Sequence, residues 1–252
     1  MDQNVALYLY CLRLGDNSLI LGHRLSEWCG HGPFLEEDIA MTNISLDLVG
    51  QSRMLLQYAA ELSGNGTTEN TLAYLRDERD FLNALLSEQP NGDFAVTNTK
   101  NYLFSVYNYH LYAELSNSKD EKLKAIAEKS IKEVAYHVRH CGKWMLRLGK
   151  GTEESHKRLQ EAVNDIWMFT EDLFESDEST ASLIEQGIAA NPETVRHNWL
   201  SDVTDQLKEA TIEIPTNTWM MKGSLQGKHS EHLGYLLAEM QTIPRTFPNS
   251  EW

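Results

Sequence analysis

The 252-residue sequence is poor in residues that bend or cross-link a chain. It contains only 15 glycines, 6 prolines and 3 cysteines. Because glycine and proline are the main breakers of regular structure, their scarcity favours long helices. The odd number of cysteines, without a CxxC spacing, is typical of a reducing compartment and argues against a disulfide framework. We therefore expect a helical protein that folds without disulfides.

Positive charge and long apolar runs are also scarce. The sequence has 22 Lys and Arg against 37 Asp and Glu, a net charge of −15. Such a charge repels nucleic acid and anionic lipid. No apolar run approaches the roughly 20 residues that span a bilayer, and the first residues lack a signal-peptide pattern. We expect a soluble, cytoplasmic protein that binds neither nucleic acid nor membrane.

Apolar residues recur at helical spacing along most of the chain. The pattern predicts helices over 5–28, 36–62, 69–88, 97–116, 120–148, 153–174, 179–186, 192–210 and 229–241. Thr152 is a predicted N-cap, and Pro244 is expected to bar any extension of the last helix. The predicted fold is all-α: a ferritin-like bundle of four long antiparallel helices with additional shorter helices. We expect one domain over 1–252, with the core helical hairpins in 1–150 and additional helices and a C-terminal loop and helix in 151–252.

Bundles of this kind often hold two iron ions, a possibility that the sequence can test. A carboxylate-bridged di-iron centre needs a Glu on each of two helices and a Glu-x-x-His on each of the other two. The predicted helix at 97–116 has no Asp or Glu before Glu114, and none occurs from Phe94 through Ala113. In the next predicted helix, Val134 stands three residues before His137. Asp16, Asp47, Val134 and His137 therefore represent degenerate centre positions, and we expect no metal in this chain.

Without iron, the polar residues near the apolar stripes need other partners. Asp16, Asp47 and Gln51 are predicted to join a buried polar network, because a buried carboxylate needs a cation or hydrogen-bond donors. The candidate partners are Arg13, Arg53 and His137. We favour this interpretation over a catalytic role for these residues.

The start of the last predicted helix is the other polar cluster. His229, Glu231 and His232 follow Lys222 and Lys228, and together they could contact a phosphate-bearing ligand or a carboxylate of a partner. The favoured alternative is simple N-capping by Ser230 with surface charge around it. A further pair at helical spacing, His23 and Glu27, is expected to form a surface or interface bond.

Several segments along nearly the whole chain resemble the C-subunit family of bacterial phenylacetyl-CoA epoxidase. The matching segments are 12–17 (LRLGDN), 22–31 (GHRLSEWCGH), 43–51 (NISLDLVGQ), 76–79 (RDER), 88–94 (EQPNGDF), 131–137 (IKEVAYH), 229–234 (HSEHLG) and 237–241 (LAEMQ).

The resemblance implies a ferritin-like component of an oxygenase complex in aerobic phenylacetate degradation. The complex converts phenylacetyl-CoA to its ring 1,2-epoxide with O₂ and NADPH. A homologous catalytic subunit, the A subunit, holds the di-iron centre, and a separate reductase holds FAD and a 2Fe-2S cluster. The C subunit is the non-catalytic, structural partner that docks on the di-iron subunit. The resemblance therefore supplies no catalytic residue and no cofactor for this chain.

Two other functions stay open on the sequence alone. The chain could be an autonomous di-iron oxidase with a divergent ligand set drawn from Asp16, Asp47, Glu133 and His137. It could instead be the module that holds the CoA thioester in the complex, through Lys222 and Lys228. The tyrosines are candidates for a subunit interface or for the core: Tyr102, Tyr107, Tyr109 and Tyr112.

Overall fold

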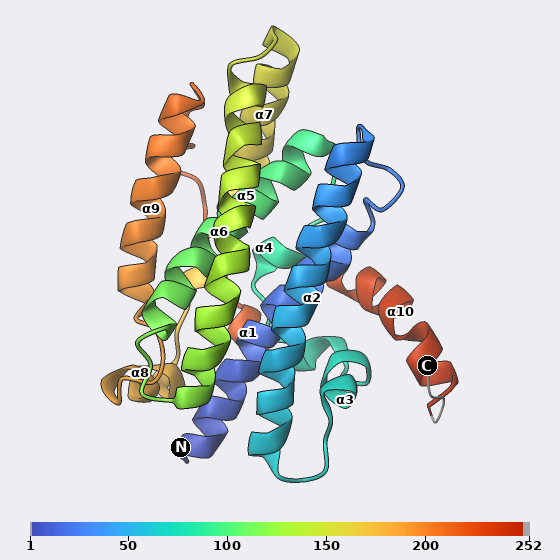
Figure 1. The fold of residues 1–252 in the computed structure, drawn as a ribbon, viewed down its shortest axis with the longest axis vertical. Coiled ribbons are helices and arrows are strands. Elements are labelled where there is room, and N and C mark those ends of the chain that lie inside the picture. Colours follow the sequence, from blue (N-terminus) through green and yellow to red (C-terminus); the bar gives the residue numbers. More distant parts are fainter. Residues whose placement is uncertain (1, 249–252) are drawn as a thin grey trace. The chain divides into compact units, whose positions relative to one another are not determined.

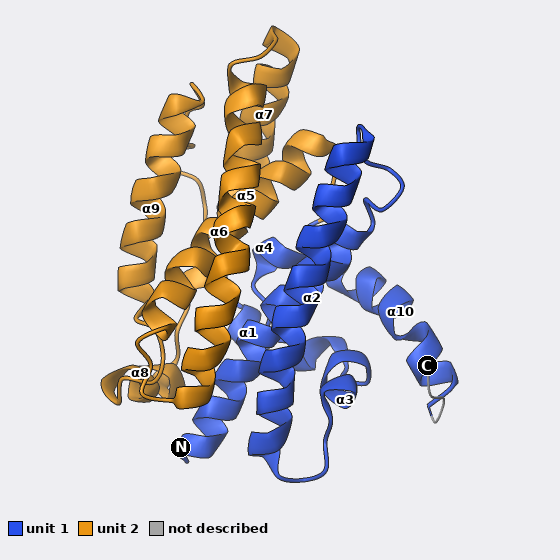
Figure 2. Ribbon diagram, viewed as in Figure 1, with its two compact units in different colours: residues 1–89, 223–252 blue, residues 90–222 orange. Residues whose placement is uncertain are grey.

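The computed structural model describes residues 2–248, and its regular structure is entirely helical. No β-strand occurs in this range, so the predicted all-α class is confirmed. The chain divides into two compact units, which we call the first unit (residues 1–89 and 223–252) and the second unit (90–222) (Figure 2). The single domain over 1–252 stays a prediction; its ends, residue 1 and 249–252, lie outside the described residues.

The first unit is built on a hairpin of two long helices, seen side by side in Figure 1. These are α1 (Gln3–Ser26) and α2 (Leu35–Ser63). Gly15 of α1 packs against Leu56 of α2, where an added Cβ would lie 2.7 Å from the leucine Cδ2. Further along, the Ser45 hydroxyl donates to the Gly22 carbonyl at 2.7 Å. The two contacts show that the helices are antiparallel, and the first glycine lets them approach closely.

The segment after α2 differs from the prediction of one helix over 69–88, which is wrong. It forms three short pieces: α3 (Glu69–Tyr74), the 3₁₀ turn η1 (Glu78–Asp80) and α4 (Leu85–Glu88). Backbone N–H groups in the gap bond to side chains of α1, since Leu82 donates to Asp16 and Ala84 to Asn17. The tertiary bonds therefore replace those that a continuous helix would make.

The second unit is organised around a buried helix. Its elements are α5 (Phe94–Leu115), α6 (Glu121–Gly149), α7 (Glu153–Ile166), the 3₁₀ turns η2 (Trp167–Phe169) and η3 (Glu171–Phe174), α8 (Glu178–Glu185) and α9 (Pro192–Glu209). α6, α7 and α9 pack around α5. The short link between α5 and α6 makes them the second predicted antiparallel hairpin. The predicted N-cap Thr152 is confirmed by its side chain, which accepts from the Ser155 N–H.

The chain returns to the first unit through the short turn η4 (Ser224–Gln226) and ends in α10 (Glu231–Thr246). The expectation that Pro244 stops this helix is wrong. The proline lies inside the last turn, where its missing N–H removes one bond and the helix is about to end anyway. Among the described residues, no helix is both long and apolar enough to span a membrane.

Candidate functional site

A buried ion pair between Asp16 of α1 and Arg76 lies in the first unit. The Asp16 side chain is fully buried. Arg76 Nη1 donates to Asp16 Oδ2 at 3.0 Å and Nη2 to Oδ1, while the Leu82 N–H donates to Oδ2 at 2.9 Å. The predicted partners Arg13, Arg53 and His137 are therefore wrong for Asp16. The true partner is 60 residues away in sequence, out of reach of any helical spacing rule.

Two backbone carbonyls and an aromatic ring also hold the Arg76 side chain in place. Its Nε donates to the Leu72 carbonyl at 2.5 Å and its Nη1 to the Asp80 carbonyl at 2.8 Å, and the guanidinium lies 4.1 Å above the Phe81 ring. Burial raises the pKa of Asp16, and the positive charge of Arg76 opposes that effect. Because every neighbour of the carboxyl donates a hydrogen, we interpret the pair as ionised.

A second buried pair joins Glu88 of α4 to His229, just before α10. Both side chains are fully buried, with His229 Nδ1 2.9 Å from Glu88 Oε2. The other ring nitrogen, Nε2, lies 2.9 Å from the Phe81 carbonyl oxygen. Both ring nitrogens therefore face acceptors and both must donate, which requires the imidazolium form. Burial by itself lowers the pKa of His229, but the hydrogen bond and charge of Glu88 outweigh it and raise the pKa.

Arg24 of α1 connects this pair to both α4 and α10. Its Nε donates to the Glu88 carbonyl at 3.1 Å and its Nη2 to the His232 carbonyl at 2.7 Å. Its Nη1 donates to Glu27 at 2.7 Å. The predicted pairing of Glu27 with His23 is therefore wrong. Burial lowers the pKa of His23, whose ring lies edge-on to Tyr74.

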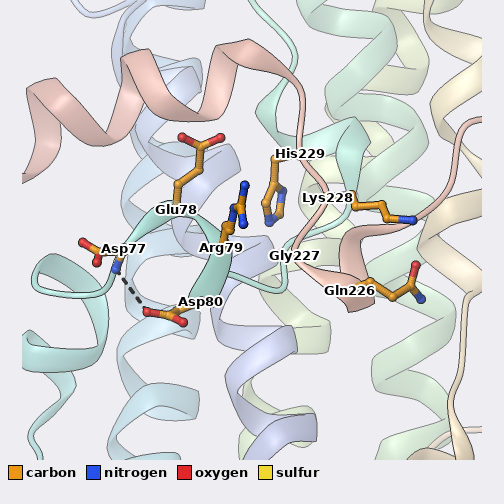
Figure 3. Close-up of a pocket in the computed structure, with 8 residues that line it drawn as sticks. All are labelled: Asp77, Glu78, Arg79, Asp80, Gln226, Gly227, Lys228 and His229. Carbon is orange, nitrogen blue, oxygen red and sulfur yellow. Dashed lines mark hydrogen bonds between the residues drawn. The ribbon is translucent and has the colours of Figure 1, made fainter.

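A pocket of about 940 Å³ opens beside these ion pairs (Figure 3). Its lining residues are Asp77, Glu78, Arg79, Asp80, Gln226, Gly227, Lys228 and His229. Gly227 has a left-handed backbone, with φ of 65°, and an added Cβ would clash with the Arg79 carbonyl oxygen. The glycine therefore allows the two walls to touch. The three carboxylates of the lining offset its three cations, which are Arg79, Lys228 and the His229 imidazolium. The pocket therefore has no surplus of positive charge with which to hold a phosphate group.

The predicted contact residues are only partly brought together. Lys228 and His229 line the pocket, whereas Glu231 is exposed in the first turn of α10 and His232 is half-buried. Lys222 is exposed and belongs to the second unit. Ser230 occupies the N-cap position as expected, but its side chain makes no capping bond. Its N–H instead donates to Glu88 at 2.5 Å.

The residues considered for iron binding do not form a carboxylate-bridged di-iron centre in the part of the chain that the structure describes. The Asp16 carboxylate is already held by Arg76 and Leu82, Asp47 is half-buried on α2, and Val134 contributes no ligand atom. Gln51 and His137 are buried. Within residues 2–248, no group of three or more His, Cys, Asp or Glu side chains could hold a metal.

Most of the tyrosines considered as interface candidates lie inside the chain. Tyr102, Tyr107 and Tyr112 are buried, whereas Tyr109 is partly exposed. The interface interpretation is therefore wrong for the three buried rings.

Three residues of the buried network were missed by sequence reasoning, namely Arg24, Arg76 and Glu88. Each lies in a segment that carries the family resemblance: 22–31, 76–79 and 88–94. The same holds for Asp16 in 12–17 and His229 in 229–234. Five separate matching segments therefore contribute to one network. Their shared resemblance to the family was the signal in the sequence that could have identified these residues.

Comparison with known proteins defines the class. A family model described as phenylacetic acid catabolic protein matches residues 1–252, and the chain belongs to this family. A particular relative is then similar over nearly its whole length: the C subunit of 1,2-phenylacetyl-CoA epoxidase from Escherichia coli (strain K12). It is 48% identical over 246 residues, which cover 98% of this chain and 99% of the relative. The predicted family is confirmed.

We predict that Asp16→Asn destabilises the protein by about 3–5 kcal/mol, because it leaves the Arg76 cation buried without its counter-charge. Chemical denaturation followed by circular dichroism measures the change. The double variant Asp16→Leu with Arg76→Met should recover part of the loss, since no uncompensated charge remains. Arg53→Gln is the exposed control and should change little. Equal stability of Asp16→Asn and the parent chain would contradict the ionised pair.

We also predict opposite pH effects for two histidines. A raised folded-state pKa at His229 means that the native state holds a proton which the unfolded state has lost. The unfolding free energy should therefore fall as pH rises above about 6.5, by up to about 1.4 kcal/mol per unit, through the folded-state pKa. A lowered pKa at His23 should instead make stability fall as pH drops below about 6.5.

Denaturation curves across pH check both effects. His229→Gln should remove the slope above neutral pH and leave the acid slope, whereas His23→Gln should do the reverse. An unchanged alkaline slope in His229→Gln refutes the assignment of its charge.

Proposed function

We propose that this chain is the C subunit of a 1,2-phenylacetyl-CoA epoxidase, with a structural, non-catalytic role in that complex. The observation that carries the proposal is the 48% identity to the C subunit of the Escherichia coli epoxidase, over 98% of this chain and 99% of the relative. The similarity therefore concerns the whole helical chain rather than one motif within it. The proposed process is aerobic phenylacetate degradation.

The ligand chemistry of the chain supports the non-catalytic role. A di-iron centre needs about six protein ligands in the bundle. Here Arg76 supplies positive charge to Asp16 where a metal would otherwise do so, and α5 offers no carboxylate from Phe94 through Ala113. We propose that this chain binds no cofactor. The di-iron centre belongs to the homologous catalytic subunit, whereas FAD, the 2Fe-2S cluster and NADPH belong to the reductase.

The role that remains is support of the di-iron subunit. The two ion pairs tie α1, the segment 76–88 and α10 into one body, so the first unit offers a rigid frame for docking. Direct binding of the CoA thioester is not favoured, because the three carboxylates of the pocket beside Lys228 offset its positive charges. The His229 ring offers no free nitrogen as a general base either, since it is buried and engaged at both nitrogens.

Reconstitution tests the proposal. We predict that the purified chain forms no epoxide from phenylacetyl-CoA with O₂, NADPH and the reductase. Addition of the di-iron subunit should give turnover, and omission of this chain should remove most of it. A co-purified complex is expected when the two proteins are expressed together. Oxygen-dependent turnover by this chain with the reductase alone would establish the rival function, an autonomous di-iron oxidase.

A further inference from the structure

The first half of α2 exposes large apolar side chains to solvent. Leu35 is 71% exposed and Leu46 is 63% exposed, and Ile39 and Phe34 are also exposed. Exposed apolar residues that occur singly need no explanation, but a contiguous set marks an interaction surface. The question is therefore whether these residues share one face.

Helical geometry places them together. At 3.6 residues per turn, Leu35, Ile39 and Leu46 lie within about 40° of arc around α2, and Gly50 extends the row within about 60°. The opposite side of the same helix is buried, with Ile44, Leu48 and Leu55 in the core. We call the row Leu35, Ile39, Leu46 and Gly50 the outer face of α2.

Gly50 gives an independent indication that another helix approaches this face. An added Cβ at Gly50 would meet nothing within 4 Å, so no contact inside the chain requires a glycine there. A glycine inside a helix costs about 1 kcal/mol relative to alanine. Gly15, in contrast, is explained by its contact with Leu56. A glycine on an outward face lets the backbone of a partner helix come close.

Charge decides what kind of partner fits. From Leu35 to Gln51 the sequence contains four acidic residues, of which Glu37 is buried, and the first Lys or Arg of α2 is Arg53. Glu36 and Asp47 flank the outer face on one side, and Asp38 flanks it on the other. Two copies that met through this face would bring like charges together, on chains that each carry −15. The surface therefore suits a different protein, with an apolar helix face flanked by Lys or Arg.

α10 also exposes apolar side chains and is the alternative docking surface in the first unit. Tyr235 and Ile243 are exposed there, but they lie about 80° apart around the helix. Glu239 is exposed on the arc between them, so a charge interrupts the apolar row. On the outer face of α2, no charged residue lies on the arc from Leu35 to Gly50, although the uncharged Asn43 is exposed beside it and Arg53 follows one turn after Gly50.

We propose that the outer face of α2 is the surface on which the catalytic di-iron subunit docks. The proposal rests on the proposed function, because it takes the occupant from the epoxidase complex. It adds the site of contact and the chemistry of the partner's surface: an apolar helix, close enough to pack on Gly50, with basic residues on its flanks.

The experiment measures the affinity of the full chain for the purified di-iron subunit, with two kinds of variant. Ile39→Lys with Leu46→Lys replaces apolar contacts by charges that a basic flank repels, and lysine keeps good helix propensity. We expect binding to weaken about 100-fold or more, as for loss of two interface anchors. Tyr235→Lys on α10 is the matched control and should bind like the parent.

Gly50→Leu separates docking from folding. Leucine favours helix over glycine and has open space at this position, so the isolated chain should melt at the same temperature or higher. Its affinity for the di-iron subunit should nevertheless fall about tenfold or more. Stability and binding therefore move in opposite directions, which a structural role inside the chain would not produce.

The outcomes are distinguishable. Parent-like binding by both α2 variants, or loss of binding in Tyr235→Lys alone, overturns the assignment of this face and leaves the proposed function standing. Loss of a homodimer of this chain in the α2 variants, with the hetero-complex intact, assigns the face to a second copy and also overturns the proposal. Failure of the parent chain to bind the di-iron subunit removes both this proposal and the proposed function.

Discussion

The ion pair of Asp16 with Arg76 holds the segment between α3 and α4 against α1 in the first unit. A carboxylate buried in a helix hairpin must be compensated, and here a guanidinium does so through two bonds. After α3 the chain is not a continuous helix, and the N–H groups of Leu82 and Ala84 donate to the side chains of Asp16 and Asn17 on α1. The same segment then supplies Glu88, which holds His229 at the start of α10. Two buried ion pairs therefore connect α1, the segment 76–88 and the start of α10.

The parts of the fold that sequence could predict are those fixed by local chemistry. The long helices follow from apolar periodicity, and the start of α7 follows from the Thr152 cap. The failures are non-local. No local pattern in 69–88 predicts that its backbone bonds to Asp16 and Asn17. No spacing rule links Arg76 to a residue 60 positions away. Pro244 misled because a proline near a helix end costs little. For the candidate site, sequence supplied Asp16 and His229 but not their partners.

Membership in the phenylacetic acid catabolic protein family and the departures from a di-iron ligand set lead to one consistent account. In this chain Arg76 meets the charge of Asp16, and Val134 stands three residues before His137, where a Glu-x-x-His motif would have its Glu. These departures support the proposed structural role, in which the helices hold the shape of the subunit without binding iron. The apolar outer face of α2, with its acidic flanks, is the proposed docking surface in this role. It repels a second copy of the chain and suits a partner with basic flanks.

We infer that Arg76, and not a metal ion, compensates the buried charge of Asp16 in this chain. Anomalous diffraction at the iron edge tests it most directly, on crystals of the complex with the di-iron subunit loaded with ferrous iron. We expect two iron peaks in the catalytic subunit, with Asp16 of this chain bonded to Arg76 and no peak within about 3 Å of that carboxylate. A pair of iron peaks on Asp16, Asp47, Glu133 or His137 would contradict it.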